Sequence, residues 1–250
     1  MISLLVAAIV FQTPTGNSLS IQDAPKVTAA SLISAMFLRY TNAVSLVGTI
    51  QMVQEAKGQS VTTDTVLQYT RPNKIYLKQT EHSSEGRSFL LTSDGKTFSY
   101  DKPKNLHGPD RCVEYTRTQY QLLDLGDMYT ATLNSIVDPS QILNVAIGRR
   151  PDLIKLTHQI SGYQIVGNYK VGSDTIYQIA GRYSLEPNLP AAAEYQIDVS
   201  ESGDFKRFVI KQMYGIPNHP EMPAIPVTTT WTSTLQVDGT PTESLYRTIK

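Results

Sequence analysis

The sequence has little cysteine and no excess of either charge, and each shortage excludes a class of protein. A single cysteine, Cys112, among 250 residues rules out an internal disulfide framework and any metal site built on several thiolates. Lys plus Arg number 22 and Asp plus Glu number 22, so no net field would draw the chain to nucleic acid or to an anionic membrane surface. We expect a globular chain with no nucleic-acid partner.

Catalytic signatures are also missing. The sequence contains no G-x-S-x-G elbow, no G-x-x-x-x-G-K-[ST] phosphate loop and no H-E-x-x-H pair. Its four histidines stand far apart, and no two are spaced to share a metal ion. We therefore predict no catalytic residue, no metal site and no cofactor, and we expect the chain to bind a partner rather than to catalyse a reaction.

The amino-terminal segment is apolar from Ile2 to Phe11 and then turns polar. The apolar run is too short to span a bilayer, but it has the length of the core of a secretory signal peptide. We expect residues 1–24 to be a signal peptide and linker; a first strand or a membrane anchor is the alternative. Because the only cysteine lies far from this run, we expect no lipidated cysteine after it.

The sequence is rich in strand patterns, which follow one helical segment. Apolar residues recur every three or four positions over residues 28–44, which predicts a helix. Alternating runs rich in threonine, valine and tyrosine predict strands, because these residues suit a half-buried pleated surface. The predicted strands cover residues 46–55, 60–70, 74–79, 89–92, a stretch ending at 100, 112–115, 163–171, 175–183, 193–199, 205–214 and 227–237.

Two shorter helices are predicted between the two groups of strands. The first covers residues 119–127 and contains three leucines. In the second, Asp138 is expected to cap the helix, Pro139 to occupy its first turn and Gly148 to end it. Each strand offers one face to a shared interior and the other to water, which indicates a single strongly curved antiparallel sheet.

The most specific pattern covers residues 71–103. Arg71-Pro72-Asn73 precedes an alternating strand, the run from Ser93 to Thr97 contains an Asp-Gly turn, and Tyr100-Asp101-Lys102-Pro103 ends the stretch. In order and spacing, the stretch resembles the LolA-like periplasmic lipoprotein carrier proteins of bacteria. The order of elements matches over residues 28–237, whereas similar residues are confined to 71–103 and, more faintly, to 196–208.

The resemblance implies one domain over residues 25–250 with an α+β, mainly β fold. This fold is a half-open antiparallel β-barrel of about eleven strands, with the amino-terminal helix and two short helices as a lid. It implies a secreted, periplasmic carrier that binds lipoprotein acyl chains or another lipid-like ligand in an apolar cavity. Its partners would be that lipid and donor or acceptor proteins of the inner or outer membrane, and we expect a monomer. The alternative on the same fold is an envelope sensor or regulatory protein–protein interaction module that transports nothing.

The candidate ligand-binding residues are apolar side chains that alternation assigns to the inner face of the sheet. Acyl chains would bind there because each methylene removed from water contributes about 0.8 kcal/mol. The alternative is a filled core without ligand space, which is the usual arrangement in small barrels. The candidates are Ile75, Leu77, Phe89, Leu91, Phe98, Tyr195, Ile197, Phe208, Ile210, Trp231 and Leu235.

Two residues take a more specific role from the resemblance. Arg71 matches the family's arginine that hydrogen-bonds the helical lid, and Ile75 matches an apolar position at the cavity entrance. A guanidinium has five donors in a fixed geometry, so it suits a latch on several carbonyl groups that ligand can release. The alternative is an arginine that ends a strand in solvent.

Overall fold

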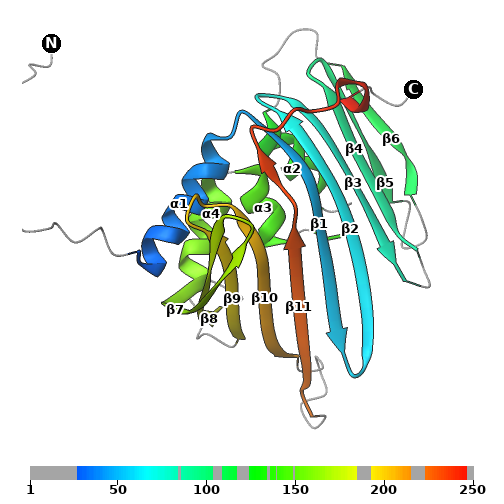
Figure 1. Cartoon of the computed structure of the whole chain (residues 1–250). Helices are drawn as coiled ribbons and strands as arrows, with labels where there is room; N and C mark the ends of the chain where they lie inside the picture. Colours follow the sequence, from blue (N-terminus) through cyan, green and yellow to red (C-terminus); the bar gives the residue numbers. More distant parts are fainter. Residues whose placement is uncertain are drawn as a thin grey trace, which may run out of the picture.

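The computed structural model describes residues 27–83, 86–103, 109–116, 124–133, 136–138, 140–148, 150–184, 193–214 and 223–246. The predicted signal peptide and linker, residues 1–24, lie outside these ranges, and so do residue 139 and most of the predicted helix at 119–127. The fold is mainly β, and the described part of the chain has four α-helices on one side of a curved sheet (Figure 1).

Within the described residues, twelve strands form one antiparallel sheet. The neighbour order is β6-β5-β4-β3-β2-β1-β11-β10-β9-β8-β7, and β12 pairs only with β1. The strands are β1 (Ser45–Ala56), β2 (Gln59–Thr70), β3 (Lys74–His82), β4 (Ser88–Asp94), β5 (Thr97–Pro103), β6 (Pro109–Thr116), β7 (Ile160–Val171), β8 (Asp174–Tyr183), β9 (Ala193–Ser200), β10 (Phe205–Tyr214), β11 (Ile225–Ser233) and β12 (Gln236–Val237).

The sheet consists of two meanders that meet in its middle. β1 to β6 follow one another on one side and β7 to β11 on the other, and the two halves join where β1 pairs with β11. The outermost strands, β6 and β7, are the two ends of this order, so the sheet curves without closing (Figure 1). The predicted half-open antiparallel architecture is confirmed.

Alternation along the strands decides which side chains face the interior. In β11, Val227, Thr229, Trp231 and Ser233 are buried, whereas the intervening threonines are partly or fully exposed. In β3, Ile75 and Leu77 are buried between more exposed lysine and tyrosine side chains. Successive side chains of a strand point to opposite faces, which is why the alternating sequence predicts the inner face correctly.

The first helix, α1 (Ala29–Asn42), has the predicted position. Thr28 caps it: its hydroxyl accepts from the Ser31 amide at 3.1 Å, and the Ser31 hydroxyl accepts in turn from the Thr28 amide. The side chains of Leu32, Met36 and Tyr40 are buried on one face. That apolar stripe lies against α3, β7 and β9.

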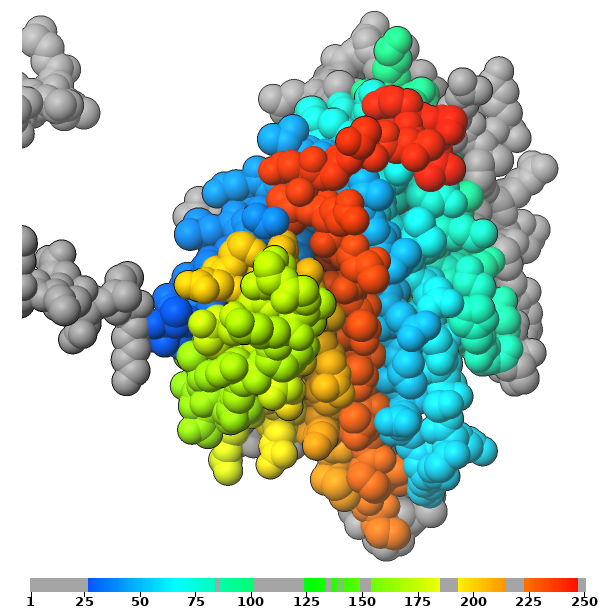
Figure 2. All heavy atoms as spheres, in the orientation of Figure 1, coloured from blue at the N-terminus to red at the C-terminus, as the bar shows by residue number. Residues whose placement is uncertain are grey.

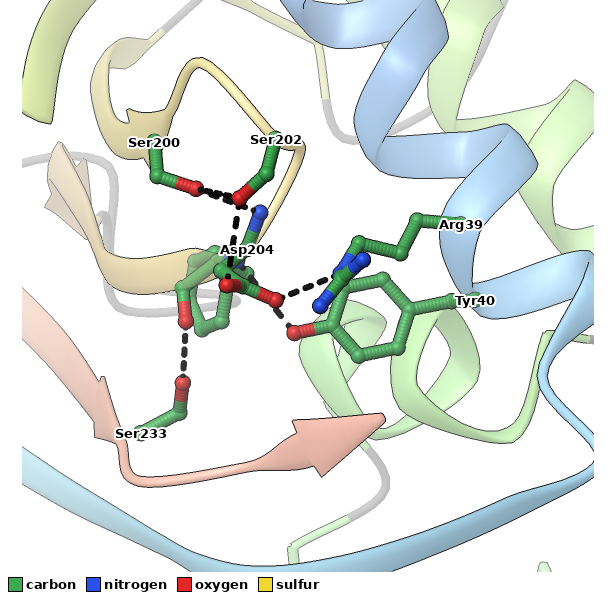
Figure 3. Close-up of polar contacts among 7 residues, drawn as sticks. Arg39, Tyr40, Ser200, Ser202, Asp204 and Ser233 are labelled. Atoms are coloured by element: carbon green, nitrogen blue, oxygen red, sulfur yellow. Dashed lines mark hydrogen bonds and ion pairs between the residues drawn. The ribbon is translucent and has the colours of Figure 1, made fainter. Parts of the chain in front are cut away.

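Polar contacts fix α1 to the turn between β9 and β10. Arg39 donates from Nε to Asp204 Oδ1 at 2.5 Å, and the hydroxyl of Tyr40 accepts from the Phe205 amide at 3.2 Å (Figure 3). Gly203 has a φ of 86° in this turn, and a Cβ there would lie 2.8 Å from the carbonyl oxygen of Ala35. Glycine therefore lets the turn approach the helix backbone closely.

The predicted helix at 119–127 is wrong in its extent. The helix α2 (Leu125–Thr132) begins after Asp124, whose carboxylate caps it by accepting from the Asp127 amide at 2.8 Å. It continues past residue 127 because Met128 and Tyr129 extend its buried face. Residues 119–123 lie outside the described ranges.

The predicted cap of the next helix is also wrong. In α3 (Gln141–Ile147) the cap is Ser140, whose hydroxyl accepts from the Leu143 amide at 3.3 Å, and not Asp138. Gly148 ends the helix in the left-handed conformation, with a φ of 69°, as predicted. The carboxylate of Asp138 instead points into the interior, toward Trp231.

Two further elements were not predicted. The helix α4 (Arg150–Gln159) follows α3, and a short 3₁₀ helix, η1 (Glu243–Tyr246), packs against β3 and β4. The sequence of α4 is mostly polar and carries Pro151 near its start, so its apolar periodicity is weak. The four residues of η1 are too few for any periodicity to appear.

Candidate ligand-binding site

The apolar residues predicted to line a cavity all lie in one buried cluster. Each of the eleven is at most 8% exposed, and all belong to the same continuous set of apolar contacts. Phe208 is central among them, with its ring centroid 5.6 Å from that of Trp231 and 6.3 Å from that of Tyr195. Side chains from α1 and α3, such as Met36 and Leu143, join the cluster and cover this inner face of the sheet.

Arg71 lies between the end of β2 and the start of β3, and its guanidinium reaches two helices. Nε donates to the carbonyl oxygen of Ala43 at 2.8 Å, just beyond α1. Nη2 donates to the carbonyl of Ile147, the last residue of α3, at 2.7 Å, and more weakly to that of Tyr40 at 3.5 Å. One side chain from the β2–β3 turn thus joins the carboxyl-terminal ends of both helices.

Tyr69 supports the same end of α3. Its hydroxyl donates to the carbonyl of Ala146 at 3.1 Å, and the Arg71 guanidinium lies 5.3 Å from the centre of its ring. Burial raises the pKa of Tyr69 to about 12, although Arg71 acts in the opposite direction, so the hydroxyl stays a donor at neutral pH. We call Tyr69 and Arg71 the carboxyl-terminal anchor of α3.

Gly148 makes this close arrangement possible. A Cβ at Gly148 would collide with the carbonyl oxygen of Tyr40 and with the guanidinium of Arg71. Glycine also adopts the left-handed conformation that ends the helix without steric cost. The two helix ends and the arginine can therefore meet at one point.

Gln79 holds the chain that leads into α3. Its side-chain oxygen accepts from the amides of Val137 and Asp138 at 2.9 and 3.0 Å, and its side-chain nitrogen donates to the carbonyl of Asp138 at 3.1 Å. The same nitrogen lies 3.1 Å from the hydroxyl of Thr65. Because Gln79 is completely buried on β3, these bonds form away from water.

The side chain of Asp138 faces the interior from the same segment. Trp231 on β11 donates from Nε1 to Asp138 Oδ2 at 3.1 Å, and both residues are buried. Burial raises the pKa of Asp138 to about 6, while hydrogen bonds from Trp231 and Ser140 oppose the rise. We call Gln79 and Trp231 the amino-terminal anchor of α3.

One feature of the sequence predicts part of the amino-terminal anchor. Gln79 continues the inner-facing series begun by Ile75 and Leu77, so a polar amide stands where alternation demands an apolar side chain. A buried polar side chain needs hydrogen-bond partners, which predicts a polar contact inside the barrel. Nothing in the sequence identified Val137 and Asp138 as those partners.

In the described part of the chain, no group of three His, Cys, Asp or Glu side chains is placed to hold a metal ion. None of the described helices combines the length and the apolar character needed to cross a bilayer.

Comparisons with known proteins give matches at the level of solved structures. No family model and no curated protein matches the chain. The structures that are similar to it include the MucA/MucB complex of Pseudomonas aeruginosa, with 11% identity, a TM-score of 0.43, and coverage of 88% of this chain and 60% of that one. This chain thus spans less than two thirds of the protein matched there.

Two other solved structures are matched over nearly their whole length. The lipoprotein LppX of Mycobacterium tuberculosis has 11% identity and a TM-score of 0.37, with coverage of 82% of this chain and 94% of LppX. A LolA superfamily protein of Nitrosomonas europaea has 12% identity and a TM-score of 0.33, with coverage of 89% and 98%.

Proposed function

We propose that this chain is a carrier or binding protein that takes an acyl chain or another lipid-like ligand between its sheet and the helices α1 and α3. The observation that carries the proposal is the contact of Arg71 with carbonyl groups at the ends of both helices, directly over the apolar cluster. A side chain that joins two helices to each other and to the sheet is suited to a lid. The eleven buried apolar residues would then be the ligand-binding surface.

The energies of opening and filling such a site are compatible. Each hydrogen bond of the charged guanidinium that opening breaks contributes only about 1.5–3 kcal/mol net, because water replaces the lost partner. A dozen methylenes buried from water contribute roughly 10 kcal/mol. A long acyl chain would therefore outweigh the few bonds that Arg71 makes, and a free lid would close again on the apolar cluster.

Ligand binding is tested directly on the purified protein. We expect native mass spectrometry to detect co-purified lipid, and a fluorescent fatty-acid probe to bind saturably and to be displaced by oleate. Absence of lipid together with a probe that oleate fails to displace would make carriage wrong.

The role of Arg71 is tested in the same assay. Arg71→Leu is expected to speed probe entry and release, because the two helix ends lose the side chain that joins them. Lys78→Leu is the control, since this lysine is exposed on the opposite face of β3. Entry and release rates equal to those of the wild type would remove Arg71 from the mechanism.

We place this activity in the bacterial periplasm. The support is the apolar run from Ile2 to Phe11 and the resemblance of residues 71–103 to periplasmic carriers. Expression of the full chain in a bacterium, followed by fractionation and mass determination, tests the assignment. We expect a periplasmic product that has lost a segment ending between residues 12 and 24; an uncleaved cytoplasmic product would contradict it.

The second candidate function is a regulatory module that binds a protein. It is favoured by β7, an edge strand on which Tyr163, Val166, Tyr169 and Val171 are exposed. Exposed apolar edges are sites where another chain adds a strand. Val166→Lys separates the candidates: it leaves fatty-acid binding unchanged if the chain is a carrier, and it abolishes capture of envelope proteins if the chain is an adaptor.

A further inference from the structure

A pocket separate from the apolar cluster lies on the outer face of the sheet, beside the β7–β8 hairpin. Its volume is about 510 Å³, and its lining includes Arg182 from β8, Glu194 from β9, and Arg207 and Lys211 from β10. Figure 2 shows the hairpin, in yellow-green, standing in front of the yellow and orange strands of the sheet. The volume falls in the range of about 300–1,000 Å³ that is typical of small-molecule sites.

Contacts across the sheet show that the hairpin covers this part of the outer face. Tyr169 on β7 donates from its hydroxyl to Asp198 Oδ2 on β9 at 3.2 Å, a bond that passes over β8. Beneath it, Asp198 is 2% exposed and Ile176 is completely buried, although alternation assigns both to the outer face. The pocket therefore has a floor of sheet and a wall made by the curled hairpin.

The lining of the pocket carries more positive than negative charge. Arg182, Arg207 and Lys211 contribute three cations, against the one carboxylate of Glu194 among the described lining residues. Glu194 is the cross-strand neighbour of both Arg182 and Lys211. Nevertheless, no ion pair or hydrogen bond to a described side chain engages any of the three cations.

We propose that this outer pocket binds an anionic group, a phosphate or a carboxylate, through the side chains of Arg182, Arg207 and Lys211. The planar guanidinium group donates two parallel hydrogen bonds to such an anion, and the ammonium group adds a third charge. The site is independent of the acyl-chain site on the inner face, and a ligand could reach it as a free anion or as a lipid headgroup.

The test is a titration of the full mature chain followed by amide chemical shifts. The probes are inorganic phosphate, dihexanoyl phosphatidic acid and, as a zwitterionic control, dihexanoyl phosphatidylcholine. We expect the first two to shift amides of β8, β9 and β10 saturably. Tighter binding of phosphatidic acid than of phosphate identifies a headgroup site, and equal binding identifies a site for the free anion. Absence of saturable shifts with both anions would overturn the proposal.

Variants separate this site from general charge attraction. The pair Arg182→Gln and Arg207→Gln is expected to weaken anion binding about tenfold or more, because both bidentate donors are removed. The matched control is the pair Lys57→Gln and Lys78→Gln, which removes the same charge from exposed positions in the β1–β2 turn and in β3. Equal weakening by both pairs would contradict the proposal. Fatty-acid probe binding is expected to stay unchanged in both, which keeps this test distinct from that of the inner site.

Discussion

The two ends of α3 are attached to the sheet by different chemistry. At the carboxyl-terminal end, a cation and a phenol donate to the free carbonyl groups of Ala146 and Ile147. At the amino-terminal end, the neutral amide of Gln79 pairs with the backbone of Val137 and Asp138. The Gln79 side chain is completely buried, whereas the bonds of Arg71 are only partly buried.

This difference predicts which end of α3 would open if the helices act as the proposed lid. Carbonyl groups at a helix end and a half-buried guanidinium can both turn to water when the contact breaks, so the net cost is small. The amides at the other end would lose their partner inside a dry interior, where an unpaired polar group is expensive. We therefore expect α3 to open at its carboxyl-terminal end and to pivot about the amino-terminal anchor.

The largest effect is expected from Gln79→Leu. The change leaves two buried amides and one carbonyl without partners, which should lower the free energy of unfolding by about 3–5 kcal/mol. Urea denaturation measures it. Gln51→Leu is the matched control, because Gln51 is exposed and makes one side-chain bond, to Asp64. A loss below 1 kcal/mol for Gln79→Leu would show that this anchor is as weak as a surface contact.

The next effect is a pH dependence that Asp138 imposes on the amino-terminal end. Its pKa is about 6 in the folded protein, against an ordinary 3.8, so the folded state binds the proton more tightly than the unfolded state. The group's stabilisation is complete below pH 3.8 and is lost as pH rises through 6, a change of up to about 3 kcal/mol.

Asp138→Asn isolates this contribution, since its amide oxygen can still accept from Trp231 without titrating. Denaturation at pH 4, 5, 6 and 7 should show a smaller decline for the variant than for the wild type. Identical pH profiles would mean that Asp138 is not the group responsible. Arg71 variants leave Asp138 and its contact with Trp231 in place, so they should keep the wild-type pH profile.

A smaller effect is expected from Arg71→Lys. Lysine keeps the charge but cannot hold the carbonyls of Ala43 and Ile147 at once, so we expect a loss of about 2 kcal/mol. Thermal unfolding together with probe-release kinetics measures it. Release of the fatty-acid probe should become faster, while the affinity of the protein for the probe changes little. A stability loss larger than that of Gln79→Leu would reverse the proposed order of the two anchors.

The smallest effect is expected at the cap of α3. Ser140→Ala removes the hydroxyl that accepts from the Leu143 amide and should cost about 1 kcal/mol. Urea denaturation measures the loss, and Ser202→Ala, in the β9–β10 turn, serves as a comparison. If Ser140→Ala were neutral, capping would not contribute to the amino-terminal end, and Gln79 and Trp231 would account for its attachment.

The sequence was sufficient for what depends on local pattern. Alternation in β3 and β11 assigned Ile75, Leu77 and Trp231 to the inner face, and periodicity located α1. The Arg-Pro-Asn motif predicted a contact of Arg71 with the helices. In the structure its guanidinium donates to carbonyl groups at the ends of α1 and α3. Its role as a latch remains the proposal that the variants above test.

What the sequence could not provide is pairing between distant segments. Gln79 meets Asp138 across 59 positions, and Asp138 meets Trp231 across 93. Read locally, Asp138 before a proline matched a helix cap, because an exposed carboxylate would serve there. In the structure the carboxyl group of Asp138 instead points inward, because Trp231 donates to it inside the barrel. Ser140 therefore caps the helix.

The most direct test of the proposed lid is residue-resolved hydrogen exchange of the purified protein with and without oleate. The account predicts that ligand speeds exchange in the last turn of α3 and at the end of α1, while the amides of Val137 and Asp138 stay protected by Gln79. Faster exchange at Val137 and Asp138 with unchanged exchange near Ile147, or no change anywhere on saturation with oleate, would contradict it.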